Sequence, residues 1–377
     1  MSGSELRDEI EMLRQTTRRF IEAEILPNIE EWRKAGEVDR SLWRKAGAMG
    51  LIGASLPEEY GGGGGAFAHE AVICEELARA DIIDFGAPVQ ALVLPYLEKF
   101  GTEAQKREWL PRAISGDAVL AVGMTEPSAG SDLQAMRTTA RRDGDDYVIN
   151  GQKVFISNGG TADLIIVAAK TDAQAKGAGI SLLLVEADRP GFRRGRKLDK
   201  IGLRAADTSE LFFEDVRVPA ENLLGGVEGQ GFRQLKTNLP QERMLIACQG
   251  LGHLEAALDE TIRYTKERMA FGQRLFDMQN TRFLLAECAT EARIARVFVE
   301  DCIEKLSRDA LDATTAAMAK WWVTDRECAI IDRCLQMFGG YGFMTEYPIA
   351  RMYMNARAQK IYGGANEIMK ELVARSL

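Results

Sequence analysis

Two adjacent glycines, Gly363 and Gly364, stand in the stretch KIYGGANEIMKEL, directly before a segment with helical spacing. Glycine tolerates positive φ and lets another group come close to the backbone. The pair therefore predicts a place where a bound molecule approaches the main chain. If that molecule is a substrate, a nearby side chain must carry out the chemistry.

Carboxylates are the first candidates for that chemistry, because other reactive groups are scarce. The chain has only two histidines, His69 and His253, so neither a histidine-rich metal site nor a Ser-His triad is expected. Its six cysteines contain no CxxC pair and lie mostly in apolar helical patterns, which is typical of small buried hydrophobic residues. We expect no disulfide framework and no metal site. General acid–base catalysis would then fall to Asp or Glu.

Charge and hydropathy narrow the class of protein. The 377 residues carry a net charge of −8, which argues against a surface that binds nucleic acid. No apolar run approaches the roughly 20 residues of a membrane span. The first residues mix acids with bases and lack the apolar core of a signal peptide. We expect a cytoplasmic protein without a membrane span.

Three segments of different texture must position the candidate residues. Residues 1–118 show helical spacing, with a first stop near Pro27, and predict an N-terminal helical domain. Residues 119–228 hold β-branched and alternating runs and predict a middle antiparallel β domain, with a hairpin turn at Asn150-Gly151. Residues 229–377 predict long helices in a four-helix-bundle-like C-terminal domain. The fold class is α+β, and the lack of βαβ alternation argues against a Rossmann fold.

Two glycine-containing loops could bind a ligand. The run of five glycines at 61–65 has no strand before it and no helix in phosphate-binding context after it, so a flexible loop is favoured. The loop GMTEPSAGSD, residues 123–132, ends the first β run. Its hydroxyls and free amides could bind a heterocycle, and a plain capping loop is the alternative.

The loop GMTEPSAGSD is followed along the chain by QKVFISNGG, ERMAFGQRL, QMFGGYG and IYGGANEI. In this order, on an α–β–α chain of this length, the set resembles the acyl-CoA dehydrogenase family over nearly the whole sequence. The resemblance implies FAD as cofactor and a homotetramer built as a dimer of dimers. It also implies desaturation of a fatty acyl-CoA between its α and β carbons, with electrons passed to electron-transfer flavoprotein. Such enzymes serve fatty acid metabolism, including β-oxidation, and a biosynthetic role is the alternative.

The resemblance gives cofactor roles to residues in separate motifs. Phe155 stands where many members have Trp, Ser157 where they have Thr, and Ala365 replaces a Thr that contacts FAD. Ser131 is expected near both the pyrophosphate and the acyl thioester. The residues implied at the flavin end are Met124, Thr125, Ser131, Phe155 and Ser157, those at the adenine-dinucleotide end are Arg268, Phe271, Gln279, Gln336, Gly339 and Gly340, and those in the last motif are Ala365 and Glu367.

The catalytic base is displaced from its commonest place. Many members read Tyr-Glu-Gly-Thr where this chain reads YGGA, and that Glu removes the α-proton. Isovaleryl- and long-chain members carry their Glu on an earlier helix, and the matching residue here is Glu242 in LPQER. The alternatives are Glu367 as the base, or Glu242 as a plain first-turn acid after Pro240.

The resemblance also implies the substrate-binding residues. The amide of Gly363 is expected to polarise the thioester carbonyl. A glycine at this position permits long or branched acyl groups without selecting one. The implied residues are Ser131, Arg243, Tyr362, Gly363 and Gly364. The alternative functions are an oxygen-using acyl-CoA oxidase and a non-catalytic or repurposed flavoprotein on the same scaffold.

Overall fold

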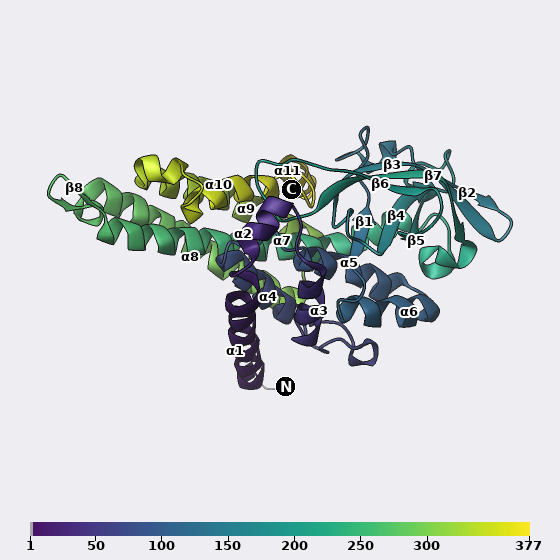
Figure 1. The fold of residues 1–377 in the computed structure, drawn as a ribbon, viewed down its shortest axis with the longest axis horizontal. Helices are drawn as coiled ribbons and strands as arrows, with labels where there is room; N and C mark the ends of the chain where they lie inside the picture. The colour runs from purple at the N-terminus through teal and green to yellow at the C-terminus, as the bar shows by residue number, and fades with distance from the viewer. Residues whose placement is uncertain (1–2) are drawn as a thin grey trace.

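A computed structural model describes residues 3–377 and shows an elongated molecule (Figure 1). A β domain occupies one end, long helices run from it to the opposite end, and the N-terminal helices pack beside the junction. The predicted α+β order of helical domain, β domain and helical bundle is confirmed. No helix in the described part of the chain is both long and apolar enough to cross a membrane.

The N-terminal part is helical, and local caps fix several helix starts. The Asp39 side chain accepts from the amide of Ser41, and Thr102 forms a reciprocal capping box with Gln105. The first helix ends in a π-helical turn just before Pro27, close to the predicted stop. The helices are α1 (Gly3–Phe20), α2 (Ile29–Ala35), α3 (Arg40–Ala48), α4 (Phe67–Arg79), α5 (Ala87–Phe100) and α6 (Glu103–Ile114).

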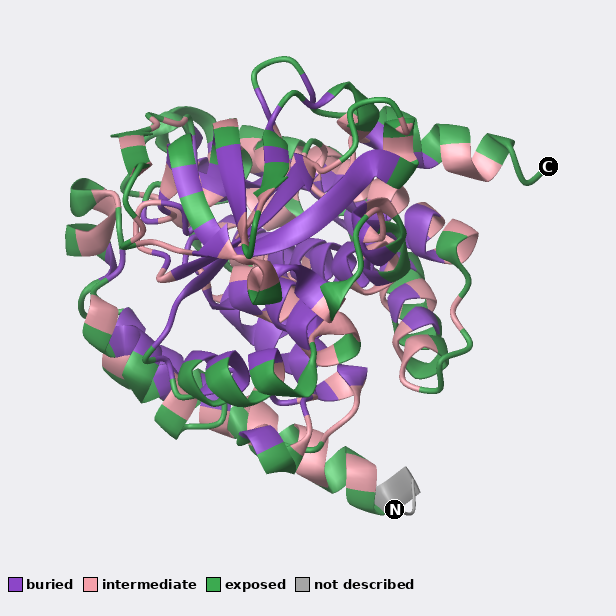
Figure 2. Ribbon diagram, turned by 90° about the vertical axis from the view of Figure 1, so that its right-hand side faces the viewer, coloured by how far each residue is buried: buried purple, intermediate pink, exposed green. Residues whose placement is uncertain are grey.

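The β domain is a seven-stranded sheet in the order β1-β4-β2-β3-β7-β6, with β5 paired to β4. Most pairs are antiparallel, as predicted, but β4 runs parallel to β1 and meets β2 in one parallel bridge. Buried residues are concentrated in the strands and in the helices packed on them (Figure 2). The strands are β1 (Leu120–Gly123), β2 (Thr139–Asp143), β3 (Asp146–Ser157), β4 (Leu164–Lys170), β5 (Ile180–Glu186), β6 (Phe192–Lys197) and β7 (Thr208–Pro219).

The C-terminal bundle is built around α7, which is 37 residues long. Pro240 lies inside this helix, so the alternative in which Glu242 stands in a first turn is wrong. A Cβ at Gly252 would lie 2.6 Å from the carbonyl oxygen of Glu75, so this glycine lets α4 approach α7 closely. The elements are α7 (Gly231–Glu267), β8 (Met269–Ala270), β9 (Gln273–Arg274), α8 (Gln279–Leu306), α9 (Ala313–Met337), α10 (Pro348–Gln359) and α11 (Asn366–Ala374).

The hairpin predicted at Asn150-Gly151 is wrong, because β3 runs through both residues. The turn before β3 instead contains Gly144, with φ of +65°. At Asn150 the strand bulges, and the side-chain amide exchanges two hydrogen bonds of 2.9 Å with Asp215 of β7. A Cβ at Gly151 would collide with Thr138. The Asn-Gly pair therefore marks a bulge and a close contact instead of a turn.

Backbone hydrogen bonds hold the five-glycine loop against the segment before it. The amides of residues 62–65 donate to the carbonyls of Pro57, Gly53, Leu56 and Ala54, at 2.8 to 3.1 Å. These amides are therefore not available to a phosphate. The six cysteines are free and five of them are buried, as predicted.

Candidate active site

The candidate base, Glu242, lies in the first half of α7 with only 6% of its surface exposed. Its Oε1 atom accepts hydrogen bonds from the Tyr96 hydroxyl at 2.6 Å and from Nδ2 of Asn238 at 3.2 Å. Burial raises the pKa of Glu242, and the two hydrogen bonds oppose that rise. A carboxylate with a raised pKa in a dry site is suited to remove a proton from carbon.

The glycine pair lies against the same face of α7 as the candidate base. A Cβ at Gly363 would collide with Cδ1 of Ile246, which follows Glu242 by one helical turn. A Cβ at Gly364 would lie 2.6 Å from Cε of Met369. The sequence predicted that a bound molecule excludes a side chain at position 363. Among the described residues, the group that such a Cβ would meet is the Ile246 side chain.

A buried lysine holds the carbonyl side of the glycine turn. Nζ of Lys320, on α9 and with no exposed surface, donates to the carbonyl of Gly364 at 2.8 Å and to Oδ1 of Asn366 at 2.9 Å. Burial, and then the charge of Arg243, lower the pKa of Lys320 to about 7. Lys320 therefore links the glycine turn to α9 of the bundle.

Arg243 is also buried, and within residues 3–377 its Nε has no hydrogen-bond partner. Burial lowers its pKa, and the neighbouring Glu242 opposes that shift. A buried guanidinium without full pairing is costly, which favours the predicted contact of Arg243 with a ligand. Tyr362 is partly buried beside this turn, while Glu367, the rival base, is exposed in the first turn of α11.

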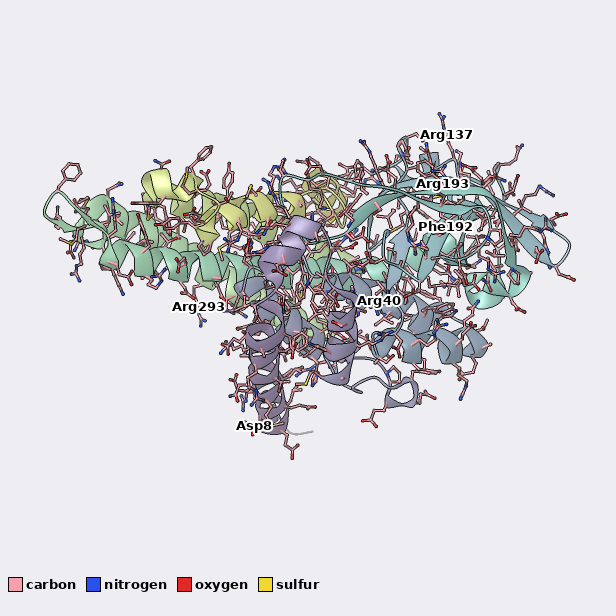
Figure 3. The ribbon with its side chains drawn as sticks, viewed as in Figure 1. Asp8, Arg40, Arg137, Phe192, Arg193 and Arg293 are labelled. Carbon is pink, nitrogen blue, oxygen red and sulfur yellow. The ribbon has the colours of Figure 1, made fainter. Side chains whose placement is uncertain are left out.

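The polar loop after β1 is held under the sheet by a buried ion pair. Nζ of Lys153 lies 2.7 Å from Oε1 of Glu126 and donates to the carbonyl of Met124 at 3.2 Å. Oε2 of Glu126 accepts from the amide of Arg137 at 2.5 Å, and the Arg137 side chain points outward from the β end of the molecule (Figure 3). These interactions fix the main chain of the loop, while the residues on its outer side remain exposed to solvent.

Phe155 stands at a second bulge of β3, where the register with β7 shifts. Its ring is 65% exposed and its φ is +61°, a conformation that is costly for an aromatic residue. Ser157 follows on the same face of the strand. The hydroxyls of Thr125 and Ser131 bond to no residue within 3–377. An exposed aromatic in strained backbone, beside free hydroxyls, fits a flat ring such as a flavin.

The residues predicted at the adenine-dinucleotide end gather at the far tip of the bundle. The guanidinium of Arg268 lies 5.3 Å from the ring centre of Tyr341, which joins the β8–β9 turn to the segment after α9. Phe271 is 97% exposed at this turn, with φ of +52°. Apart from neighbours along the chain, no atom of residues 3–377 lies within 4 Å of a Cβ built at Gly272, Gly339 or Gly340. The other residues at the tip are Gln279, Gln336, Gly339 and Gly340.

The two predicted parts of the flavin site lie far apart along the long axis of the molecule. The loop after β1 and the end of β3 are in the β domain, whereas β8 marks the far tip of the bundle (Figure 1). The bundle keeps them apart within one chain.

Helix α5 joins the candidate base to the flavin-end half. Gln90 of α5 donates to the carbonyls of Ala113 and Ala118 and accepts from the amide of Leu120 in β1. Asn158, just after β3, donates to the carbonyl of Gly86 before α5. Glu242, the candidate base, contacts α5 through Tyr96 and is thus held in a fixed position relative to the sheet.

Sequence reasoning missed several residues that shape the site. Asn238 and Glu242 are four residues apart, so their contact was readable from helical spacing. Tyr96, Lys153 and Lys320 gave no local signal, because their partners are 27 to 146 residues away. Each of these three is a polar side chain in an apolar stretch, and only the fold shows what it bonds.

Comparison with known proteins agrees with this architecture. The models of the N-terminal, middle and C-terminal domains of acyl-CoA dehydrogenases match residues 7–117, 121–216 and 229–377. The chain belongs to the acyl-CoA dehydrogenase family. It is 45% identical over 372 residues to the mitochondrial long-chain specific acyl-CoA dehydrogenase of Sus scrofa, covering 98% of this chain and 86% of the relative.

Solved structures of acyl-CoA dehydrogenases and related proteins share the fold. The acyl-CoA dehydrogenase of Geobacillus kaustophilus superposes with a TM-score of 0.94 at 46% identity, over 98% of this chain and 97% of the other. A structure described as electron transferring flavoprotein of Acidaminococcus fermentans gives 0.93 at 38% identity, over 97% of each. A glutaryl-CoA dehydrogenase of Mycobacterium smegmatis in complex with FADH2 gives 0.92 at 31% identity, over 98% and 94%.

This acyl-CoA dehydrogenase is an oxidoreductase of a family that depends on FAD. The residues present fit that cofactor. The exposed ring of Phe155 and the free hydroxyls of Thr125 and Ser131 could contact a flavin ring, and the exposed Arg268 could pair with a pyrophosphate.

Proposed function

We propose that the enzyme oxidises a long-chain or branched fatty acyl-CoA to the trans-2-enoyl-CoA, with Glu242 as its base. The observation that carries the proposal is the placement of one buried carboxylate. Glu242 lies on the α7 face whose next turn, at Ile246, packs against Gly363. A base on this helix is thereby directed toward the turn where other members carry theirs.

The protein's part in the reaction is to take a proton and to hold the thioester. The carboxylate of Glu242 takes a proton from the α-carbon. The electron pair of the broken C–H bond forms the new C=C bond. Bound FAD would supply the acceptor for the hydride that leaves the β-carbon. The amide of Gly363 donates to the thioester carbonyl, which makes the α-proton more acidic. Lys320 and Asn366 keep that turn in place.

The cofactor half-sites support a shared FAD site between copies. We propose that the tip residues of one chain complete the flavin site of another, in a homotetramer built as a dimer of dimers. Exposed glycines and Phe271 at the tip, with no covering residue from the same chain, support an interface there. A site shared in this way couples FAD binding to assembly.

Long-chain substrates are favoured by the kinship with a long-chain specific enzyme at 45% identity. Electron-transfer flavoprotein is the proposed acceptor, on the family's chemistry and the likeness to a structure described with that name. Location in the cytoplasm and a role in β-oxidation are part of the same proposal.

The test is anaerobic bleaching of the bound flavin by butanoyl-, hexadecanoyl- and 3-methylbutanoyl-CoA. We expect the parent enzyme to bleach fastest with one long or branched thioester, and Glu242→Gln, still loaded with FAD, to be slower by several orders of magnitude. Glu367→Gln removes the rival base and, once loaded with FAD, should still bleach. Normal bleaching by Glu242→Gln with loss in Glu367→Gln would move the base. No bleaching of the parent by any thioester would favour a repurposed flavoprotein, and rapid oxygen consumption an oxidase.

A further inference from the structure

The two oxygens of the Glu242 carboxylate have different surroundings. Oε1 takes both hydrogen bonds, from Tyr96 and from Asn238, whereas Oε2 accepts none from residues 3–377. A hydrogen bond to one oxygen draws negative charge toward it and fixes the plane of the carboxylate. Oε2 is therefore the oxygen left free to meet a substrate proton.

The hydroxyl of Tyr96 is held in place by the fold. Its side chain has no exposed surface, and it sits on α5, which the hydrogen bonds of Gln90 tie to β1. Asn238, the second donor, is itself fixed because its Nδ2 also donates to the carbonyl of Leu92 on α5, at 3.2 Å. Glu242, the candidate base on α7, is thus oriented by α5, a helix of the N-terminal domain.

Accepting Glu242 as the base of the proposed function, we propose that Tyr96 is the positioning residue of that base. Its phenol binds Oε1, presents Oε2 to the α-proton, and favours the ionised carboxylate within a dry pocket. The proton passes from the α-carbon to Oε2, and Tyr96 keeps its own proton throughout. Two charged side chains also face Glu242: Lys99 from α5 and Arg243 from α7.

The expected consequence is a change in pH dependence, which a purely structural role would not produce. Burial raises the pKa of Glu242 and the Tyr96 hydrogen bond opposes it, so removing the hydroxyl raises that pKa further. In Tyr96→Phe the rate of anaerobic bleaching should need a higher pH to reach its plateau. We expect the acid limb to move up by about one to two pH units. Above the limb, the rate should recover to within a few fold of the parent.

The experiment measures the pH–rate profile of bleaching by hexadecanoyl-CoA in FAD-loaded parent, Tyr96→Phe and Asn238→Ala. The second variant removes the weaker donor and should shift the limb in the same direction by less. Tyr60→Phe is the matched control, because that buried tyrosine bonds Glu103 at 3.0 Å, away from Glu242. Its limb should not move.

Two outcomes overturn the proposal. An unmoved limb in both Tyr96→Phe and Asn238→Ala, or an equal shift in Tyr60→Phe, shows that Tyr96 does not position the base. Glu242→Gln, run in parallel, separates this failure from failure of the proposed function. If Glu242→Gln is inactive while the limb stays put, only the role of Tyr96 fails. If Glu242→Gln bleaches normally, the base and its positioning residue fail together.

Discussion

Ile246 occupies the space that a side chain at Gly363 would need. Its Cδ1 lies 2.2 Å from the position that the Cβ would take, and the glycine has φ of +65°. The same helix presents Glu242 one turn earlier. A carboxylate at position 242 and a glycine at position 363 therefore belong to one packing arrangement. Ile246, one turn after Glu242, fills the space that a side chain at position 363 would need.

This packing leads to an expectation about moving the base. In a Glu242→Gln background, Gly363→Glu restores the Glu that many members carry, yet we expect almost no recovery of bleaching. The new side chain meets Ile246 and must adopt a strained backbone. Adding Ile246→Ala should give partial recovery, measured as the anaerobic bleaching rate with flavin content as the control. Recovery equal to the parent without the Ile246 change would contradict the role given to that side chain.

The strained backbone at Phe155 predicts a trade between stability and cofactor binding. Phe155→Gly relieves a left-handed conformation that costs on the order of 1–3 kcal/mol, and it loses little buried surface. We expect the apoprotein to melt no lower than the parent while its affinity for FAD falls. Phe155→Leu is the matched control: it loses the ring but keeps the strain. A lower melting temperature for Phe155→Gly than for Phe155→Leu would argue against strain at this bulge.

We expect the buried ion pair of Lys153 and Glu126 to stabilise the loop after β1 more than either side chain does without the other. Lys153→Met leaves a buried carboxylate without its cation, which typically costs about 3–5 kcal/mol. We expect a lower melting temperature and loss of FAD on gel filtration. The double variant Lys153→Met/Glu126→Gln should be less damaged than the single one, because no unpaired charge remains. Additive losses in this cycle would show that the two side chains do not act as a pair.

The buried Lys320 predicts a pH-dependent contribution to stability. Its pKa is lowered from 10.5 to about 7 in the folded protein. Between these values the unfolded chain holds a proton that the folded chain lacks, so folding is favoured increasingly as pH rises through the window. We expect Lys320→Met to lose more melting temperature relative to the parent at pH 9.5 than at pH 6.5.

The exposed Lys370 provides the control for that measurement. Lys370→Met should show the same small difference at both pH values, because this side chain is exposed to solvent in the folded protein. A constant difference for Lys320→Met across pH would mean that the buried ammonium titrates as it does in water.

Local sequence settled much of the architecture. The three domain-sized textures, the helix near Pro27 and the burial of the cysteines follow from periodicity and residue type, which act over a few neighbours. The α4–α7 contact at Gly252 and the bulge at Asn150 do not. An Asn-Gly pair has the same local preference in a turn and in a bulge, and here Asp215 and Thr138, contributed by distant segments, decide between them.

The site divides in the same way. The sequence by itself determined the family, and with it the candidate Glu242, the flavin-end loop and the glycine pair, because these are contiguous motifs in a fixed order. Only the tertiary structure showed that Ile246 fills the space at Gly363, that Tyr96 binds the candidate base Glu242, and that the two predicted parts of the flavin site lie far apart along the molecule. Those relations depend on which helices and strands pack together, and no local pattern of residues carries that information.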